Sequence, residues 1–330
     1  APAAAPGPGE VQVTVANGGI CGSDLHYYLH GGFGAIRIQE PMALGHEVSG
    51  VIAALGEGVT GLEVGDKVAV NPSRPCGRCS YCLRGQPNQC FDMRFNGSAM
   101  RMPHEQGLFR EALTLPATQV ERFAPEADLA FAAMTEPLAV CLHAVRQAGS
   151  LVGKTVLVAG SGPIGCLTIG AARLAGATRI VATDISDTPL AVARAMGAHD
   201  TINLATTPDG LAPVQRDKGQ VDVSFECSGA PQALGGLLTA TRAGGTVVLV
   251  GMGGEAPLPL QLAVAKELTL RGAFRFHEEF ATAARVISEG RIDLAPLLTG
   301  VLGADDAVAA FDLAADKSRA MKVQIRFSGA

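Results

Sequence analysis

The sequence has little charge and no concentration of positive charge. Charged residues make up 17% of the 330 residues and the formal net charge is -5. Nucleic acids and acidic membrane surfaces attract clusters of lysine and arginine, so neither is expected as a partner. Apolar residues make up 48% of the chain, which is enough for large cores and argues against disorder. The length favours about two domains.

Long apolar runs are also missing. None reaches the roughly 18 residues that a membrane span needs. Residues 1–9 have no charged start and no long apolar core, so they are not expected to act as a secretory signal. We therefore expect a cytoplasmic protein. In that compartment the eight cysteines are more often metal ligands or core residues than disulfides.

The most specific motif is a run of four cysteines in a loop rich in proline, glycine and arginine. They follow C-x2-C-x2-C-x7-C and are Cys76, Cys79, Cys82 and Cys90. Four thiolates at this spacing can surround a zinc ion at about 2.3 Å each, leaving no position open for a substrate. We predict a structural zinc in residues 76–90. Free thiols and an iron–sulfur cluster are the alternatives.

A histidine followed by a glutamate lies between glycines in the apolar residues 41–50. Burying His46 and Glu47 is costly unless a partner offsets the lost hydration. Both are zinc ligands, and Cys21 would add a thiolate, although alone it would be interpreted as a small core residue. Glu136 precedes Pro137 in an apolar run, as a helix cap or as a further carboxylate of the site. These residues predict a catalytic zinc.

A nucleotide-binding motif follows the apolar strand 154–159. It has the form G-x-G-x-x-G and opens an alanine-rich helix. Glycines there let the backbone approach a pyrophosphate at the helix N-terminus. Asp184 ends the next strand, where a carboxylate would bind the ribose hydroxyls and favour NAD over NADP; a strand-end cap is the alternative. The motif residues expected to bind NAD are Gly160, Gly162, Pro163, Ile164 and Gly165.

Strands and helices alternate after this motif, which predicts a parallel, doubly wound sheet. Ligands bind beyond the carboxyl ends of the strands in such sheets. The residues that follow three predicted strands are therefore expected to line the nicotinamide: Ser228, Gly251, Met252, Phe274 and Arg275. Ahead of the motif, the strands predicted at 11–16, 48–55 and 66–70 indicate a small β-barrel or sandwich, with a glycine turn at 17–19.

The motifs resemble those of the zinc-dependent medium-chain dehydrogenases/reductases. Over nearly the whole chain they occur in the family's order, which is Cys21-Gly22-Ser23-Asp24-x-His26, Gly45-His46-Glu47-x2-Gly50-x5-Gly56, the four cysteines and Gly160-x-Gly162-x2-Gly165. The resemblance implies an α/β plus β fold, with a GroES-like catalytic domain and an inserted Rossmann domain. The expected ranges are 1–137, 138–274 and, returning to the first domain, 275–330. A homodimer or homotetramer is also implied.

Thr135-Glu136-Pro137-Leu138 is similar to the sorbitol dehydrogenase branch, in which a glutamate replaces the third cysteine ligand of liver-type enzymes. There Cys21, His46 and either Glu47 or Glu136 would hold the zinc, with a water completing the shell. The implied cofactors are two zinc ions per chain and NAD, with NADP the alternative. Other segments resemble members that oxidise the secondary alcohol of a sugar acid. Small residues at 97–99 stand where polyol members carry an aromatic wall.

The resemblance also implies roles for single side chains. Ser23 would take the hydroxyl proton and pass it to His26, whose imidazole suits proton release near neutral pH. Tyr27 and Arg275 would hold the substrate, with Arg275 on a carboxylate. Ser23 or Asp24 could instead cap a helix, and His26 could be a surface residue. Arg94, Arg101 and His104, in a broken loop, are expected at the surface.

Two other functions remain open. One is a polyol dehydrogenase acting on sorbitol or xylitol, which would share this zinc and cofactor chemistry. The other is a zinc-stapled, nucleotide-binding sensor without turnover. A sensor has no need of a proton relay, so the presence of Ser23 and His26 argues against it. The motifs and the family they resemble together favour a sugar-acid dehydrogenase.

Overall fold

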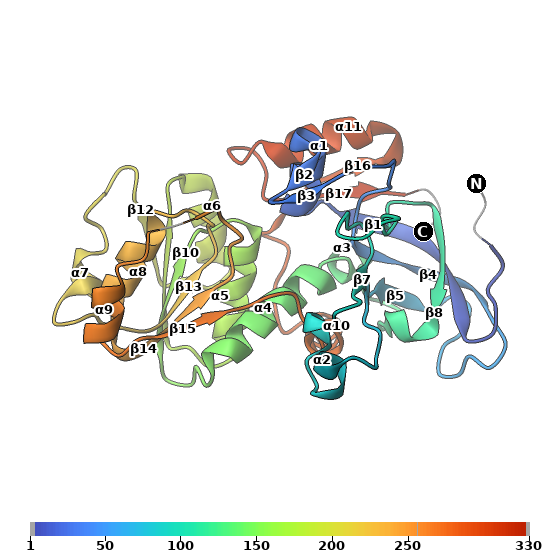
Figure 1. The fold of residues 1–330 in the computed structure, drawn as a ribbon. Coiled ribbons are helices and arrows are strands. Elements are labelled where there is room, and N and C mark those ends of the chain that lie inside the picture. Colours follow the sequence, from blue (N-terminus) through green and yellow to red (C-terminus); the bar gives the residue numbers. More distant parts are fainter. Residues whose placement is uncertain (1–3, 256, 328–330) are drawn as a thin grey trace. The chain divides into compact units, whose positions relative to one another are not determined.

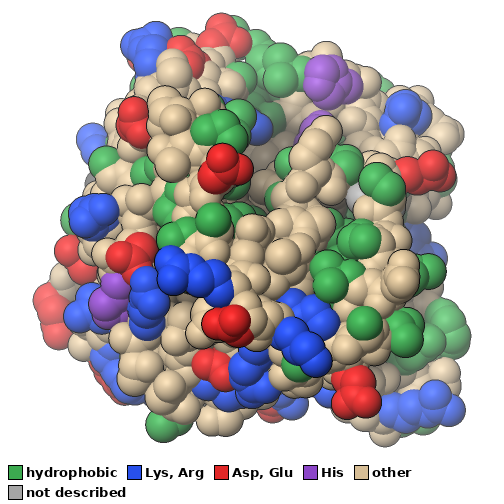
Figure 2. Space-filling view, turned by 90° about the vertical axis from the view of Figure 1, so that its left-hand side faces the viewer, with side chains coloured by type: hydrophobic (Ala, Val, Ile, Leu, Met, Phe, Trp, Pro, Cys, Tyr) green, Lys and Arg blue, Asp and Glu red, His purple; other side chains and the backbone are tan. Residues whose placement is uncertain are grey.

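The computed structural model describes residues 4–255 and 257–327, and the chain divides into two compact units (Figure 1). The first unit comprises Ala1–Ala139, His277–Arg291 and Leu298–Ala330, and the second Val140–Phe276 and Ile292–Leu297. Within the described ranges, no helix is both long and apolar enough to cross a membrane. On the face seen in Figure 2, acidic and basic side chains lie interspersed.

A mixed sheet organises the first unit. Its strand order is β16-β17-β1-β4-β5-β9, and β8 also pairs with β1. Val11, Val13 and Val15 of β1 are fully buried, as the two-residue period of a strand with one core face requires. The strands are β1 (Glu10–Gly19), β4 (Glu47–Leu55), β5 (Lys67–Val70), β8 (Ala112–Pro116), β9 (Val120–Arg122), β16 (Leu298–Gly303) and β17 (Lys322–Arg326).

The turn predicted at residues 17–19 is wrong. These residues continue β1, and they pair with both β4 and β17. The glycines are needed here for close approach: a Cβ on Gly19 would lie 2.1 Å from a carboxylate oxygen of Glu47. The missing side chain therefore makes room for Glu47.

Short elements complete the first unit. Two small antiparallel pairs join β2 (Gly32–Phe33) to β3 (Ile36–Arg37) and β6 (Ser73–Arg74) to β7 (Arg94–Phe95). The helices are α1 (Gly22–His30), α2 (Ser80–Leu83), α3 (Leu129–Ala132), α10 (Glu279–Ser288) and α11 (Ala307–Ala315), with 3-10 turns at Pro87–Gln89, Ala117–Gln119 and Ala304–Asp306. Helix α4 (Thr135–Ala148) begins in this unit and continues into the second.

The second unit confirms the predicted doubly wound parallel sheet. Its order is β12-β11-β10-β13-β14-β15, and every neighbouring pair is parallel. The strands are β10 (Thr155–Ala159), β11 (Arg179–Asp184), β12 (Asp200–Asn203), β13 (Val221–Glu226), β14 (Thr241–Leu249) and β15 (Thr269–Gly272). The helices are α5 (Pro163–Leu174), α6 (Asp187–Ala195), α7 (Ala212–Gln215), α8 (Ala233–Ala240) and α9 (Leu260–Ala265).

Both faces of this sheet are covered, which explains why its strands are apolar runs. Leu157 of β10 packs in one cluster with Leu237 of α8. The next residue, Val158, points to the opposite face, where it lies beside Gly165 of α5. A parallel sheet buried on both faces needs this continuous hydrophobicity. The carboxyl ends of all its strands consequently meet at one edge, where the glycine motif begins.

Candidate active site

Three side chains with metal-binding chemistry converge in the first unit. The ligand atoms of Cys21, His46 and Glu47 all lie within 4.8 Å of one another. Cys21 is the N-cap of α1, whereas Glu47 opens β4 and follows His46 directly. His46 is 5% exposed and Glu47 1%. A thiolate, an imidazole and a carboxylate this close form a donor set that suits zinc with a fourth position left open.

Asp24 fixes the two segments that carry these ligands. It is fully buried, and its carboxylate accepts hydrogen bonds from the backbone N–H groups of Cys21 and Gly45, each at 3.0 Å. The first of these bonds is half of a capping box at the start of α1. A carboxylate oxygen also lies 3.6 Å from His46 Nδ1. Asp24 therefore holds Cys21 and His46 in place, beyond the helix cap considered from the sequence.

The environment of His46 attracts a cation. Its Nδ1 is buried and has no hydrogen-bond partner within the described residues. Burial opposes protonation, but the negative charges of Asp24 and Cys21 outweigh it and raise the pKa of His46 well above its usual value. A zinc ion on the imidazole would replace that proton, with Asp24 orienting the ring from the other nitrogen. The donor set therefore fits a metal, and Nδ1 beside Asp24 is the nitrogen left for the orienting contact.

Glu47 carries a buried ion pair that the sequence did not reveal. Nζ of Lys322 lies 2.7 Å from each oxygen of Glu47 and 3.2 Å from the carbonyl oxygen of Ile20. Burial alone would lower the pKa of Lys322. The negative charges of Glu47 and Cys21 have the larger opposite effect, so the pKa lies above its ordinary value. A carboxylate oxygen bonded to lysine keeps a lone pair for a metal. The pairing of β17 with β1 brings Lys322 here from 275 residues away.

Glu136 lies buried at the start of α4, with 6% of its surface exposed. Within the described residues it does not belong to the group of mutually close ligand atoms, although its charge interacts with His46 and Glu47. Burial raises the pKa of Glu136 to about 7, against the opposing charge of His46. This carboxyl group is therefore poised to hold or release a proton near neutral pH.

Helix α1 presents three of the predicted residues on one face. Ser23, His26 and Tyr27 are three and four positions apart, the spacing of neighbours on a helix. His26 is exposed, and its pKa is lowered by partial burial and by the positive charges of His30 and Lys317. Tyr27 is buried, and its hydroxyl oxygen accepts the N–H of Ala99 at 3.2 Å.

The four-cysteine lobe forms a second group of potential ligands. The sulfur atoms of Cys76, Cys79, Cys82 and Cys90 all lie within 4.8 Å of one another. Sγ of Cys79 is 3.5 Å from that of Cys82 and 3.8 Å from that of Cys90. A tetrahedron with Zn–S bonds of about 2.3 Å has edges of about 3.8 Å. The spacing therefore fits a bound zinc.

The charges within the lobe also favour a cation. Backbone N–H groups of Cys82 and Phe91 lower the pKa of Cys79 to about 6. Loss of hydration and the neighbouring thiols raise the pKa of Cys82 to about 12. The thiol of Cys79 thus ionises easily, whereas that of Cys82 resists because it has lost hydration and is hydrogen-bonded to its neighbours. A divalent cation would hold all of them as thiolates.

The glycine motif of the second unit forms a tight strand-to-helix turn. Gly160 adopts φ +85°, and a Cβ on Gly165 would lie 1.8 Å from the Gly160 carbonyl oxygen. A Cβ on Gly162 would meet no atom within 4 Å. Gly162 is the N-cap of α5, with Pro163 next to it. The turn is therefore tightly packed at Gly160 and Gly165. It is open at Gly162, at the helix N-terminus, where a pyrophosphate needs access to the backbone.

Residues at the carboxyl edge of the sheet are arranged around two carboxylates. Asp184 accepts hydrogen bonds from the backbone N–H groups of Ser161, Ile185 and Ser186. Glu226, which the sequence analysis did not single out, accepts the N–H groups of Ser228 and Gly229. The remaining predicted cofactor residues follow β10, β14 and β15 at the same edge, and they are Ile164, Gly251, Met252, Phe274 and Arg275.

Comparison with known proteins agrees with both units. Residues 7–125 match the alcohol dehydrogenase GroES-like domain, and residues 163–289 match the zinc-binding dehydrogenase family. The chain is 44% identical over 316 residues to L-idonate 5-dehydrogenase (NAD(P)(+)) of Escherichia coli, covering 96% of this chain and 91% of that protein. It is 37% identical to sorbitol dehydrogenase of Arabidopsis thaliana, covering 96% and 88%.

The chain belongs to the zinc-binding dehydrogenases. The crystal structure of the Escherichia coli L-idonate 5-dehydrogenase superimposes with a TM-score of 0.93 at 44% identity, and it covers 96% of this chain and 91% of that one. The family and the fold predicted from the motifs are thereby confirmed, as are zinc and a nicotinamide cofactor. The assignment of individual residues as zinc or cofactor ligands is still a prediction.

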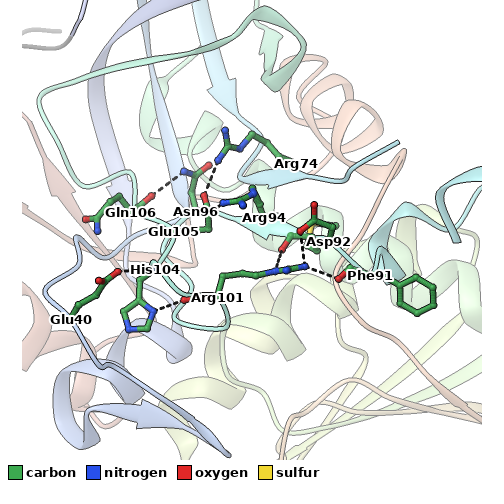
Figure 3. A network of polar contacts seen from close by, with 11 residues as sticks. Glu40, Arg74, Phe91, Asp92, Arg94, Asn96, Arg101, His104, Glu105 and Gln106 are labelled. Carbon is green, nitrogen blue, oxygen red and sulfur yellow. Dashed lines mark hydrogen bonds and ion pairs between the residues drawn. The ribbon is translucent and has the colours of Figure 1, made fainter. Parts of the chain in front are cut away.

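The surface position expected for His104 needs correction, whereas the side chains of Arg94 and Arg101 are 48% and 34% exposed, as expected of surface residues. His104 is 5% exposed, donates through Nδ1 to the carbonyl oxygen of Arg101 and accepts the N–H of Gln39 at Nε2. Arg94 pairs with Glu105, whereas Arg101 pairs with Asp92 at 3.0 Å (Figure 3). These groups form a polar network that ties the loop down. A sequence scan has no signal for such a network, because its members approach only in the folded chain.

The cysteine lobe makes a first prediction. The purified dehydrogenase should contain two zinc ions per chain, and Cys79→Ser should lose one of them together with some stability. Metal analysis by emission spectroscopy and a thermal melt measure both. Cys227→Ser is the matched control, since Cys227 lies in the second unit outside both ligand groups. Retention of two zinc ions by Cys79→Ser would refute the lobe assignment.

The raised pKa of Glu136 makes a second prediction, for the metal-free chain. Its pKa is about 7 in the folded state against an ordinary 4.5, so the folded state holds the proton more tightly. The free energy of unfolding should fall as pH rises between these values, by about 3 kcal/mol. Glu136→Gln should reduce the fall by about that amount, leaving the contributions of Asp24 and His46, whose pKa values are also raised. Urea unfolding of both chains at pH 5 and pH 8 measures the difference.

The control for that measurement is Glu121→Gln. Glu121 is a carboxylate only partly buried on β9, and its pKa is also raised by desolvation. Because solvent screens it, this substitution should change the pH dependence much less. Equal pH profiles for the wild type and Glu136→Gln would contradict the assignment of a strongly raised pKa to Glu136.

Proposed function

We propose that this dehydrogenase oxidises a secondary hydroxyl of a sugar acid with NAD(P), and that L-idonate is its substrate and 5-dehydro-D-gluconate its product. The observation that carries the proposal is the close grouping of Cys21 with the buried His46 and Glu47, in a chain 44% identical to an L-idonate 5-dehydrogenase. The donor set provides the chemistry, and the relative provides the substrate class.

Zinc would lower the pKa of the substrate hydroxyl, and NAD(P) would accept the hydride. In our proposal Cys21, His46 and Glu47 hold the metal, with Glu136 as the nearby carboxylate that exchanges with Glu47 or stores a proton. Lys322 balances the charge of Glu47 at 2.7 Å. Lys322 thereby offsets part of the negative charge of the ligands, which leaves more of the metal's positive charge to act on a substrate oxyanion.

The proton would leave along α1. Ser23 would take it from the substrate hydroxyl and pass it to His26, one helical turn further on. The exposed His26, with its lowered pKa, is neutral at pH 7 and so can accept a proton and release it to water. This use of the two residues is supported by their common helix face.

Tyr27 would contact the polar chain of the substrate. Its oxygen already accepts the N–H of Ala99, so its own hydrogen is directed elsewhere. A phenolic hydrogen fixed in this way can be donated to a hydroxyl or carboxylate of the substrate. We also propose Arg275, in the second unit, as the cation for the substrate carboxylate. In that unit Gly160–Gly165 and Asp184 would hold the dinucleotide, and Ser228, Gly251, Met252 and Phe274 the nicotinamide end.

The rival function is oxidation of a polyol, which the 37% identity to a sorbitol dehydrogenase supports. The small residues Gly97, Ser98 and Ala99 favour a sugar acid, because they leave room where polyol members carry an aromatic wall. A dimer or tetramer and a cytoplasmic location are parts of the proposal that follow from the family resemblance. A sensor without turnover is disfavoured, since Ser23, His26 and Glu136 would then serve no chemistry.

The substrate panel is the direct test. Initial rates of NADH or NADPH formation should give kcat/KM for L-idonate at least about tenfold above those for sorbitol and xylitol, because a site that pairs with a carboxylate rejects analogues lacking it. Tyr27→Phe should lower kcat/KM for L-idonate. The control Tyr28→Phe should not, since Tyr28 is 41% exposed and bonds to Asp312 instead. Faster turnover of sorbitol would favour the rival.

A further inference from the structure

A buried carboxylate joins two arginines beside the cysteine lobe. Glu105 is 7% exposed, and each of its oxygens pairs with a different guanidinium. One oxygen lies 2.8 Å from Nη2 of Arg74, and the other contacts Nη1 of Arg94 (Figure 3). Both arginine side chains are partly exposed, at 42% and 48%. The carboxylate thus satisfies two cations at once.

The two arginines mark the two ends of the lobe. Arg74 precedes Cys76 by two residues, and Arg94 follows Cys90 by four. They lie directly opposite each other, because β6 pairs with β7 in the register Arg74 with Arg94. Like charges facing each other across two strands are destabilising. Glu105 therefore offsets a repulsion that would otherwise separate β6 from β7. We call this strand pair, Ser73–Arg74 with Arg94–Phe95, the neck of the lobe.

The same neck touches the proposed catalytic metal site. Phe95 follows Arg94 and is buried, and its ring lies 5.6 Å from the ring of His46, centroid to centroid. His46 follows residues 43–45, whose carbonyl oxygens accept the N–H groups of residues 107–109 at 2.8 to 3.0 Å. Glu105 is two residues before that segment. The contacts form a continuous path from Glu105 through Arg94 and Phe95 to His46.

A second arm of the path leads to Tyr27. Glu105 pairs through its backbone with residues 97 and 98, accepting the N–H of Gly97 at 3.0 Å and donating to the carbonyl oxygen of Ser98 at 3.3 Å. The next residue, Ala99, donates its N–H to Tyr27. A Cβ on Gly97 would lie 2.7 Å from the carbonyl oxygen of Gly45, so the chains are in close contact here. Displacement of this hairpin would move Tyr27 as well.

We propose that Glu105 is a positioning residue: it clamps Arg94 and Arg74 so that Phe95 holds the ring of His46 in the orientation that binds the catalytic zinc. This rests on the proposed function, which places zinc on Cys21, His46 and a carboxylate. The clamp acts through Arg94 and Phe95, and none of these contacts involves a cysteine of the lobe. The ion pair with Arg94 positions His46, because Arg94 is adjacent to Phe95, which contacts the His46 ring. The ion pair with Arg74 does not, because Arg74 is adjacent to the cysteine lobe instead.

The test measures how fast each zinc leaves the full-length holoenzyme. A chromophoric chelator, 4-(2-pyridylazo)resorcinol, reports release, and Cys79→Ser identifies the phase of the catalytic site. Arg94→Gln should speed that phase by about tenfold, as loss of a group that orients a metal ligand does. Arg94→Lys keeps the positive charge and should restore most of the slow release. Thermal melts establish that the variants remain folded.

Arg74→Gln is the matched control. It removes an arm of the same clamp with similar exposure, yet it should leave the catalytic phase nearly unchanged. Equal effects of Arg74→Gln and Arg94→Gln, or no rescue by Arg94→Lys, would overturn the proposal. If Arg94→Gln does not fold, Glu105→Gln replaces it, with faster release from the catalytic site expected. If the variant binds two zinc ions and releases the catalytic one at the wild-type rate, the clamp is contradicted but the proposed function is not. If the wild-type chain contains only the lobe zinc, the proposed function itself is contradicted.

Discussion

The burial of opposite charges around His46 is the constraint on which the rest of the site depends. Asp24, Cys21 and Glu47 bring negative groups to an imidazole that is 5% exposed. Burying such groups without partners would be very costly. Lys322 and a metal ion together would balance them. The local chain geometry, from the capping box at Cys21 to the side-chain-free Gly19, makes the close approach possible.

Each unit supplies a distinct part of the chemistry. The mixed sheet of the first unit brings β1, β4 and β17 side by side, and so places Cys21, Glu47 and Lys322 at neighbouring strand ends. The parallel sheet of the second unit gathers its strand ends at one edge, where Gly162 leaves a helix N-terminus open. The side chains proposed to bind the catalytic metal therefore come from the first unit, and those proposed to bind the dinucleotide from the second.

Features that are local in sequence could be predicted. The cysteines at 76–90 and the glycines at 160–165 have spacings that almost dictate their geometry, and the apolar runs indicated the parallel sheet. Lys322 and Phe95 could not be predicted, because pairing between distant strands and loops brings them to the site. The turn predicted at residues 17–19 was wrong for a physical reason. Gly19 has no side chain because Glu47 packs against its backbone, and not because the chain turns there. His104 was misplaced because its ring is satisfied entirely by neighbouring loops.

The central claim is that sulfur, imidazole and carboxylate ligands share one zinc at Cys21 and His46. X-ray absorption at the zinc edge of the Cys79→Ser chain tests it most directly, because that chain should retain this metal alone. We expect a shell with one sulfur at about 2.3 Å and nitrogen or oxygen ligands at about 2.0–2.1 Å. A shell of sulfur only, or one without any sulfur, would contradict the claim.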